Sequence, residues 1–510
     1  MNIFNKKNKT LSFLDKVYQF AKKKGEISTL TVQREFKIGY GLAWRSIDAL
    51  VTLGLLNKCG VPGHYTYQCN EKGTAKNKDE SIIINLKNQE RSKLKKQLWD
   101  KAYDKMIAIY GDLPDKAILE RFYSEKKMFN VSDAIILIDL IARIRSSSNE
   151  IGFQISLGGT EGSCFVSYLL GAVENNPLPL HYYCPNCKHI ELVQDKQYPL
   201  DMPSKPCDCG CNMTADGYNI PYETHIGMSQ ISRPNVWVAP AFLERAKRIV
   251  EETMPTFKIV TLIKGKYHKY VFVPYDGTEN EVKSPDNVDN LYDCYSHITI
   301  VPLELHERLF ELEKNTGIQM SSIALDDPSI MRGFMTQDIE DIPNFHSIDS
   351  HRLYMTDLFA LVKPQSRLDL LQILGAVHGT NTWRKNADIL VQSGVPISSI
   401  PLHRDDLFQL LQSKFSSHGC EGNGLAFNIS QLTRRGIYNT KGMDASTRAL
   451  LESLELEDWV IPYMEKIVYM FPKAHCVQYL NFSMAFMWYK INYPDVYSKV
   501  MEGFFDNGKQ

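Results

Sequence analysis

The pattern of apolar and polar positions divides the chain into segments of different character. Residues 11–70 combine short amphipathic helical runs with turns and end in a short β pattern. Residues 71–92 are polar and poor in aromatic side chains, which predicts a linker, with one short apolar run at 82–86 that fits a strand. From residue 93 to about 150, and again from about 355 to 500, apolar residues recur with a helical period, so both regions are predicted to be largely helical.

The first segment predicts a compact helix–turn–helix with a wing. A helix with Leu11, Leu14 and Val17 on one face precedes two short helices joined by a turn at 38–41, and a short β pattern follows. In a DNA-binding domain of this shape the second of the two short helices, at about 42–53, enters the major groove.

Charge strengthens this interpretation of the first segment. The whole chain contains 58 Lys and Arg against 59 Asp and Glu, a formal charge of −1. Residues 1–70 contain eleven basic and four acidic residues, a charge of +7, which leaves −8 for the remainder. A small basic domain beside a mildly acidic body is typical of a part that binds a polyanion.

One stretch of this domain, "VQREFKIGYGLAWRSIDALVTLGLL", resembles the gamma winged-helix domain of FtsK translocases, which reads double-stranded DNA. That family usually has Asn-Arg after the Gly-Tyr, where this chain has Gly41 and Leu42, so the family's sequence specificity is not carried over. The residues expected to contact DNA are Arg34, Lys37, Tyr40 and Arg45. The alternative is a winged helix that binds protein.

Five of the 11 cysteines crowd into one short segment. Cys184 and Cys187 form a C-x-x-C pair, and Cys207, Cys209 and Cys211 follow about twenty residues later, a separation typical of a tetrahedral thiolate zinc site. Zinc needs four ligands and five thiols are present, so Cys207 and Cys211 are alternative ligands. A closed four-cysteine site of this kind is structural, because no coordination position is left for chemistry.

The stretch "SLGGTEGSCFVSYLLG", residues 156–171, joins a glycine turn to the start of a helix. Such a turn presents free backbone N–H groups and the positive end of the helix dipole, which together can hold phosphate. The stretch lacks the lysine of a Walker loop and the spacing of a dinucleotide fingerprint, so a plain glycine turn is the alternative.

Six separated motifs resemble, in order, the PolC-type alpha subunit of bacterial DNA polymerase III. They are "AIYGDLPDKAILERFYSEKKMF", "LGGTEGSCFVSYLLGAVENNPLPLHYYCPNCKH", "DGYNIPYETHIG", "ALDDPSIMRGFM", "VKPQSRLDLLQILGAVHGTNTWRKNADILVQSG" and "IVYMFPKAHCVQYLNFSMAFMWYKINYP". The resemblance implies an α+β fold in which the winged helix of residues 1–70 and the linker precede a thumb-like helical region at 93–150, a reduced palm with a zinc knuckle at 151–310, and a largely helical fingers region at 311–510. Within the palm, residues 241–300 predict a helix and a β-hairpin around Lys264 to Lys269.

The resemblance also gives the glycine stretch a meaning. In the family this loop lies against the triphosphate of the incoming nucleotide, and here it falls on residues 158–163. The family's arginine at the start of the loop is Gly158 in this chain, and Glu161 puts a negative charge where phosphate would lie, so we expect poor phosphate affinity. The vestigial nucleotide site implied by the resemblance comprises Gly158, Gly159, Gly162, Ser163, His378, Lys473 and His475. A packing role for the fingers residues is the alternative.

A polymerase needs carboxylates to hold two divalent ions. In the family two of them lie in a Pro-Asp-Ile-Asp segment soon after "IPYET", and the third lies on a later strand. Residues 225–240 of this chain contain no acidic residue, and the third position falls at about Pro302. We therefore expect no catalytic residues and no catalytic magnesium. Asp276, Asp326 and Asp327 are the candidate substitutes, although the last two belong to the separate "DDPSIM" motif.

These features predict a catalytically inactive PolC paralogue, a pseudoenzyme of a mobile element that engages double-stranded DNA or replisome proteins. The alternatives are an active minimal DNA-directed DNA polymerase with relocated metal ligands, and a winged-helix transcription regulator. No apolar run is long enough to cross a bilayer and no signal peptide opens the chain, so we expect a cytoplasmic protein without a membrane partner.

Overall fold

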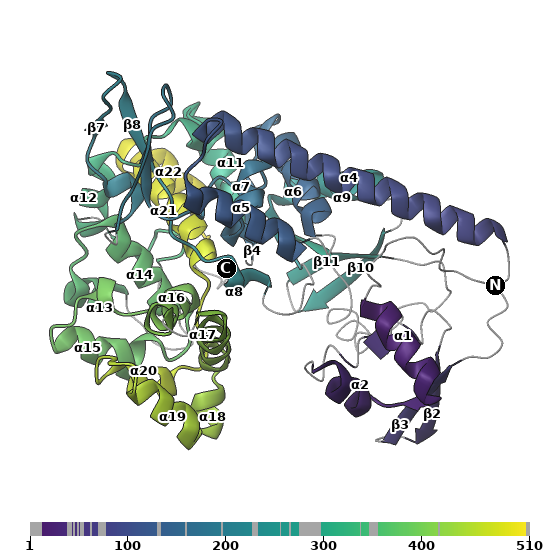
Figure 1. Cartoon of the computed structure of the whole chain (residues 1–510). Helices are drawn as coiled ribbons and strands as arrows, with labels where there is room; N and C mark the ends of the chain where they lie inside the picture. The colour runs from purple at the N-terminus through teal and green to yellow at the C-terminus, as the bar shows by residue number, and fades with distance from the viewer. Residues whose placement is uncertain are drawn as a thin grey trace. The chain divides into compact units, whose positions relative to one another are not determined.

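The computed structural model consists of two compact units, Met1–Lys93 and Leu94–Gln510 (Figure 1). It describes residues 13–37, 43, 46–47, 50, 56–61, 64–69, 78–129, 134–158, 161–194, 197–226, 233–254, 257–264, 267–274, 297–336, 338–345, 355–416 and 419–505. Within these ranges the fold is mixed α+β and mostly helical, as predicted. None of the helices that they contain combines the length and the apolar character needed to cross a bilayer.

The first unit contains helices and a small antiparallel sheet, and most of the second short helix predicted at about 42–53 lies outside the described residues. The elements are α1 (Phe13–Lys24), β1 (Glu26–Ile27), α2 (Thr29–Phe36), β2 (Leu56–Val61) and β3 (His64–Cys69), with strand order β1-β3-β2. Ser28 begins α2 with a capping box, because its Oγ accepts from the N–H of Thr31 at 3.2 Å while its own N–H donates to Thr31 Oγ1 at 2.7 Å. Val17, Ile27, Val32 and Tyr67 belong to its buried core.

The prediction of a strand at 82–86 is wrong, because this run lies inside helix α4 (Lys78–Tyr110). The helix also occupies most of the segment that we expected to be a linker. A short apolar run alone does not separate strand from helix. Here the run precedes a long stretch rich in Lys, Glu and Gln, which are strong helix formers. Each residue added to an existing helix gains one hydrogen bond, so the helix extends through the run.

In the second unit, the part of α4 that follows Lys93, α5 (Lys116–Phe129) and α6 (Ala134–Asn149) share one core with a five-stranded sheet. The Trp99 ring packs edge-on against Phe122, with ring centroids 5.6 Å apart, and stacks on Phe129 at 6.3 Å. Helix α6 is buried over most of its length because it carries the apolar run "AIILIDLIARI" between the other helices and the sheet.

The five strands of this sheet have the order β10-β11-β12-β9-β4. Their bounds are β4 (Ser156–Gly158), β9 (Asn235–Val238), β10 (Phe257–Lys264), β11 (Tyr267–Pro274) and β12 (Ile298–Pro302). The hairpin predicted around Lys264 to Lys269 is confirmed as β10–β11, and the helix predicted before it is α9 (Leu243–Thr253). Strands β9 and β12 run parallel, with Val236 beside Ile300, and both side chains join the core shared with α6 and α9.

A second sheet, with strand order β6-β5-β8-β7, carries the cysteine-rich segment. It consists of β5 (His181–Tyr183), β6 (Ile190–Leu192), β7 (Lys205–Pro206) and β8 (Asn212–Asp216), with the short helix η2 (Pro199–Asp201) between β6 and β7. We call this segment, residues 181–216, the cysteine ribbon.

The region from residue 304 onward is helical and has its own core, coloured green to yellow in Figure 1. Its helices are α11 (Glu304–Thr316), α12 (Pro328–Thr336), α13 (Met355–Val362), α14 (Arg367–His378), α15 (Asp388–Gln392), α16 (Arg404–Lys414), α17 (Gly419–Arg434), α18 (Ile437–Lys441), α19 (Ala445–Glu452), α20 (Val460–Lys466), α21 (Lys473–Asn492) and α22 (Pro494–Met501). Helix α21 is buried on most sides and packs against α12, α14 and strand β4 of the five-stranded sheet. It therefore joins the two cores of the second unit.

Candidate functional site

Four of the five clustered cysteines converge in the cysteine ribbon. Cys184 and Cys187 follow β5, while Cys207 and Cys209 lie between β7 and β8, and the four sulfur atoms all lie within 4.8 Å of one another. The Sγ atoms of Cys184 and Cys209 are 3.4 Å apart, and those of Cys187 and Cys207 are 3.5 Å apart. A tetrahedral site with Zn–S bonds of about 2.3 Å has S···S edges of about 3.8 Å, so the four thiols fit a zinc ion.

The backbone around these cysteines is shaped for a metal. The N–H of Cys184 bonds the carbonyl of His189 at 2.8 Å, and the N–H of Cys207 bonds the carbonyl of Cys211 at 2.8 Å, which closes two tight turns. The backbone N–H of Cys187 lowers the pKa of Cys184, and the backbone N–H of Cys211 is the largest of several hydrogen bonds that lower the pKa of Cys209 to about 6. Both effects favour the thiolate, which is the form that binds zinc, whereas burial and hydrogen bonds with the neighbouring thiols raise the pKa of Cys207.

The geometry favours one of the two alternative ligands. Among the residues that the structure describes, Cys184, Cys187, Cys207 and Cys209 form the only group of three or more potential ligands close enough to hold one ion, and Cys211 is not a member. Cys211 instead supplies the backbone carbonyl that closes the second turn. The arrangement therefore favours Cys207 as the fourth ligand.

The glycine stretch begins in β4 and continues through the short helix η1 (Glu161–Ser163) into α7 (Phe165–Leu169). A Cβ atom at Gly158 would lie 2.7 Å from the Trp237 ring, and one at Gly162 would lie 3.2 Å from the Cβ of Ala474 in α21. Gly159 lies outside the described residues. Close packing against Trp237 requires Gly158, and close packing against α21 favours Gly162, both without reference to a bound phosphate.

The backbone N–H groups that open α7 already have an anionic partner. The Glu125 carboxylate, from α5, accepts from the N–H of Phe165 at 2.8 Å and from the N–H of Val166 at 3.0 Å. Arg121 Nε holds the same carboxylate at 2.6 Å, and Arg121 Nη2 donates to the carbonyl of Ser163 at 2.6 Å. The side chain of Glu125 thus occupies the place where phosphate would meet the start of this helix.

Strands β9 and β12, which the resemblance associates with metal-binding carboxylates, lie side by side. Asn235 of β9 pairs with Thr299 of β12, and Trp237 pairs with Val301, so these four side chains share one face of the sheet. The next pair brings Val238 beside Pro302, the residue at the third expected carboxylate position. None of these paired residues on β9 and β12 is acidic.

Aromatic rings cover Trp237 on this face. The ring centroid of Trp237 lies 4.6 Å from that of His475 and 5.8 Å from that of Tyr479, and Tyr479 packs against His378 at 5.1 Å. Phe471 completes the group, 4.9 Å from His475. We call Trp237, His378, Phe471, His475 and Tyr479 the aromatic cluster. Burial, with His378 and Arg404 adding to it, lowers the pKa of His475 to about 3, so this ring is neutral near pH 7.

Lys473, which the resemblance places near the nucleotide, has a protein partner. Lys473 Nζ lies 3.0 Å from Asp406 Oδ1, and the backbone N–H of Lys473 donates to Asp405 at 2.7 Å. Burial disfavours the charged form of Asp406, but Lys473 and His403 outweigh it and hold the pKa of this carboxyl well below its usual range. The structure therefore brings His378 and His475 together in the aromatic cluster and pairs Lys473 with a carboxylate.

The substitute metal ligands do not form a site among the described residues. Asp327 Oδ1 accepts the backbone N–H of Ser329 at 2.8 Å at the start of α12, and this bond lowers the pKa of Asp327. Asp326 is exposed and belongs to no group of potential metal ligands there. Asp276 lies outside the residues that are described.

Two of the four residues expected to contact DNA lie in the described part of the first unit. Arg34 is in the last turn of α2, and Lys37 ends that helix in the left-handed conformation with φ of 50°. Both are exposed. Tyr40 and Arg45 lie outside the described residues.

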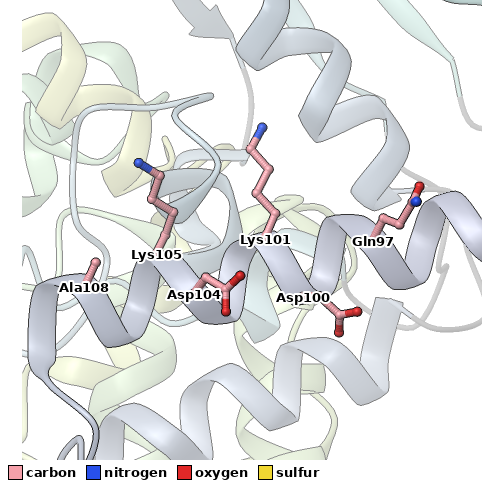
Figure 2. A pocket seen from close by; sticks show the side chains of 6 residues that line it. All are labelled: Gln97, Asp100, Lys101, Asp104, Lys105 and Ala108. Atoms are coloured by element: carbon pink, nitrogen blue, oxygen red, sulfur yellow. The ribbon is translucent and has the colours of Figure 1, made fainter.

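A shallow depression along α4 carries no recognisable chemistry (Figure 2). It is lined by Gln97, Asp100, Lys101, Asp104, Lys105 and Ala108, all from this one helix. Lys101 lies 3.6 Å from Asp139, and acids and bases alternate along the rest of the helix face. Such alternation is typical of a solvated surface.

Sequence reasoning missed three side chains that contact the glycine stretch: Arg121, Glu125 and Trp237. Glu125 and Arg121 are one helical turn apart. This spacing is equally typical of an ion pair on the surface and of a buried pair that binds the start of another helix, so only the fold identifies their role. Trp237 carried a clearer signal, because a large aromatic side chain stands in the segment where the resembled family has a metal ligand.

No family model matches the chain. A protein named DNA polymerase III PolC-type from Thermotoga maritima is 26% identical over 461 residues, covering 76% of this chain and 33% of the relative. Relatives of the same name from Lactococcus lactis subsp. lactis and Clostridium perfringens are 26% and 24% identical, covering 78% and 77% of this chain and 28% and 32% of their own lengths. The chain thus spans about a third of the length of the curated relatives that it matches.

Proposed function

We propose that this distant homologue of PolC-type DNA polymerase III is a DNA-binding protein that retains part of the polymerase body without its nucleotidyl-transfer chemistry. The observation that carries the proposal is the face of β9 and β12, where Asn235, Trp237, Thr299 and Val301 stand side by side. The aromatic cluster covers the strand that, by the resemblance, would present two carboxylates.

The chemical argument rests on what two divalent ions require. Polymerases of this type use carboxylates that bridge the ions, activate the primer hydroxyl and offset the charge of the leaving pyrophosphate. A tryptophan ring offers no metal ligand, a proline side chain offers none, and a single asparagine oxygen carries no formal charge. The side chains of Asn235, Trp237 and Pro302 therefore support a loss of catalytic metal binding.

The glycine loop supports the same conclusion for the nucleotide. A triphosphate placed at the start of α7 would meet the buried Glu125 carboxylate, which already holds two backbone N–H groups and Arg121. Displacing it would break a buried ion pair, and leaving it in place would put like charges together. We infer that the loop persists as packing between the palm sheet and α21.

The first unit is the part that we propose binds double-stranded DNA. Residues 1–70 carry a charge of +7, and Arg34 and Lys37 are exposed at the end of α2. Each phosphate neutralised by such a side chain releases counterion, so binding weakens as salt increases. Replisome proteins are further proposed partners, through the retained fingers helices. Zinc, held by the four cysteines, has a structural role in this proposal.

Two binding measurements on the full chain test the proposal. Fluorescence anisotropy with labelled duplex DNA should show binding that falls steeply between about 50 and 200 mM salt. The protein–DNA complex should not bind a deoxynucleoside triphosphate in the presence of magnesium. Absence of DNA binding at low salt would contradict the proposed DNA-binding role. Magnesium-dependent binding of the triphosphate that matches the template base would contradict the proposed loss of nucleotidyl-transfer chemistry.

A further inference from the structure

Four exposed basic residues gather in the helical region, outside the remnant nucleotide site. They are Arg384 and Lys385 in the irregular turn η6 (Trp383–Ala387), Arg435 directly after α17, and Lys466 at the end of α20. We call these four residues the basic patch.

Hydrogen bonds hold the segments of the basic patch together. Lys466 Nζ donates to the backbone carbonyl of Lys385 at 3.2 Å, which joins the end of α20 to η6. Asn439 belongs to α18, the helix that follows Arg435, and its Nδ2 donates to the carbonyl of Lys466 at 3.2 Å. The three segments are therefore fixed against one another by the fold.

The two acidic residues that adjoin these segments, Asp388 and Glu465, are already engaged. The Glu465 carboxylate pairs with Arg448, and the Asp388 carboxylate accepts three backbone N–H groups at the start of α15. Within the described part of the chain, no acidic side chain forms an ion pair with Arg435 or with the two lysines of the patch. The patch therefore keeps its positive charge.

A buried neighbour adds to the crowding of positive charge. Burial, with the positive charges of Arg404 and Arg435 adding to it, lowers the pKa of Arg434 to about 10. Like charges therefore repel one another beside the patch. An anion bound there would reduce this repulsion.

Lys385 has a backbone conformation that favours glycine. Its φ of 57° and ψ of 23° lie in the left-handed region, which costs a residue with a side chain free energy that glycine avoids. Its ammonium has no partner among the residues that the structure describes. Strained residues gather at binding sites, where the side chain makes a contact that the strain supports. The conformation of Lys385 therefore points to a partner outside the chain.

We propose that the basic patch binds the phosphate backbone of duplex DNA. This inference rests on the proposed function, since it takes DNA as the polyanion, and it adds a contact in the second unit. A duplex presents phosphates along both strands, so cations on three separate segments can each neutralise one. The contact holds DNA without reading its sequence, because phosphates carry no sequence information.

A triple charge reversal in the full chain tests the proposal. Each phosphate contact that is lost reduces the slope of log affinity against log salt by about 0.9. Lys385→Glu/Arg435→Glu/Lys466→Glu should therefore reduce the slope by about 2.7 and weaken duplex binding at least about tenfold at about 150 mM salt, as measured by fluorescence anisotropy.

The matched control makes the same change of net charge elsewhere in the helical region. Lys363, Lys414 and Lys499 are exposed and lie outside the patch, so Lys363→Glu/Lys414→Glu/Lys499→Glu should keep the wild-type slope. Wild-type affinity and slope in the folded patch variant, or equal losses in the two triple variants, overturn the proposal.

A single variant separates binding from folding. Lys385→Gly removes one cation and suits the left-handed backbone, so duplex affinity should fall about threefold while the melting temperature does not fall. Lys363→Gly is its control, because Lys363 is also exposed with φ of 49°. It precedes α14, whereas η6 follows that helix of 12 residues, about 18 Å long. Wild-type affinity in Lys385→Gly, or an equal loss in Lys363→Gly, overturns the proposal.

The variant Arg34→Glu/Lys37→Glu distinguishes a failure of this inference from a failure of the proposed function. We expect both this variant and the patch variant to bind duplex DNA more weakly than the wild type. If only the α2 variant loses affinity, the first unit binds DNA and the inference is wrong. If only the patch variant loses affinity, the inference holds and the assignment of DNA binding to the first unit is wrong. No duplex binding by the wild type at low salt overturns both.

Discussion

At the scale of single residues, the choice between Cys207 and Cys211 has a measurable consequence. Cys207 belongs to the group of four convergent thiols, and Cys211 does not. We expect one zinc per chain, lost or strongly reduced in Cys207→Ser and retained in Cys211→Ser, because zinc binding needs all four thiolates. Elemental analysis of the purified proteins measures this directly. Equal zinc contents in the two variants would contradict the assignment.

Glu125 provides a second prediction at this scale. Its carboxylate is buried and bonds Arg121 and two backbone N–H groups, so Glu125→Ala leaves two buried amides without a partner and removes the counter-charge of a largely buried guanidinium. We expect a loss of about 3 kcal/mol in the free energy of unfolding. Glu120→Ala, which removes an exposed partner of Lys116 on the same helix, should cost less than about 0.5 kcal/mol. Urea unfolding measures the free energy of unfolding of both variants. Similar losses in the two would contradict the stabilising role assigned to the Glu125 carboxylate.

At the scale of elements, α21 makes the aromatic cluster sensitive to acid. The pKa of His475 is lowered to about 3 by burial, while an unfolded histidine titrates near 6.5. Between these values the unfolded chain binds the proton more readily than the folded one, so this residue's contribution to stability falls as the pH drops below about 6.5.

The variant His475→Phe isolates this effect. It removes the titrating group and keeps an aromatic ring against Trp237 and Tyr479. The decrease in melting temperature between pH 7 and pH 5 should therefore be smaller in the variant than in the wild type. Identical decreases would mean that the folded protein binds a proton at His475 as easily as the unfolded chain does.

Helix α2 carries the prediction for DNA binding. Reversing the charge of its two exposed basic residues with Arg34→Glu and Lys37→Glu should weaken duplex binding by the full chain and reduce its salt dependence by about one phosphate contact each. Lys116→Glu, an exposed reversal on α5, is the matched control. Anisotropy titrations at several salt concentrations give both quantities. An unchanged affinity in the α2 variants would favour a winged helix that binds protein.

At the scale of the whole molecule, sequence reasoning succeeded where local pattern decides the outcome. The clustering of Cys184, Cys187 and Cys209 in space was predicted from their spacing in the sequence. The β-hairpin around Lys264 to Lys269 was also predicted from nearby residues. It failed at residues 82–86, where a short apolar run fits either helix or strand and its helical neighbours decide.

Contacts between distant segments explain what the sequence did not reveal. Glu125 reaches backbone groups forty residues away, and Trp237 meets rings more than two hundred residues further along the chain. No local period encodes either contact, because both depend on how α5, β9 and α21 are placed by the fold. The choice of Cys207 over Cys211 likewise required the geometry of the ribbon.

Primer extension is the measurement that tests the central claim most directly. The full chain is incubated with a primed template, all four deoxynucleotides and magnesium or manganese, beside a variant with Asp326→Asn and Asp327→Asn, the two acids suggested as relocated ligands. The account predicts that the wild type binds the primed template and adds no nucleotide, because β9 and β12 lack the carboxylates that hold the two ions. Extension by the wild type would contradict it, and loss of that extension in the variant would show that the metal site has moved to Asp326 and Asp327.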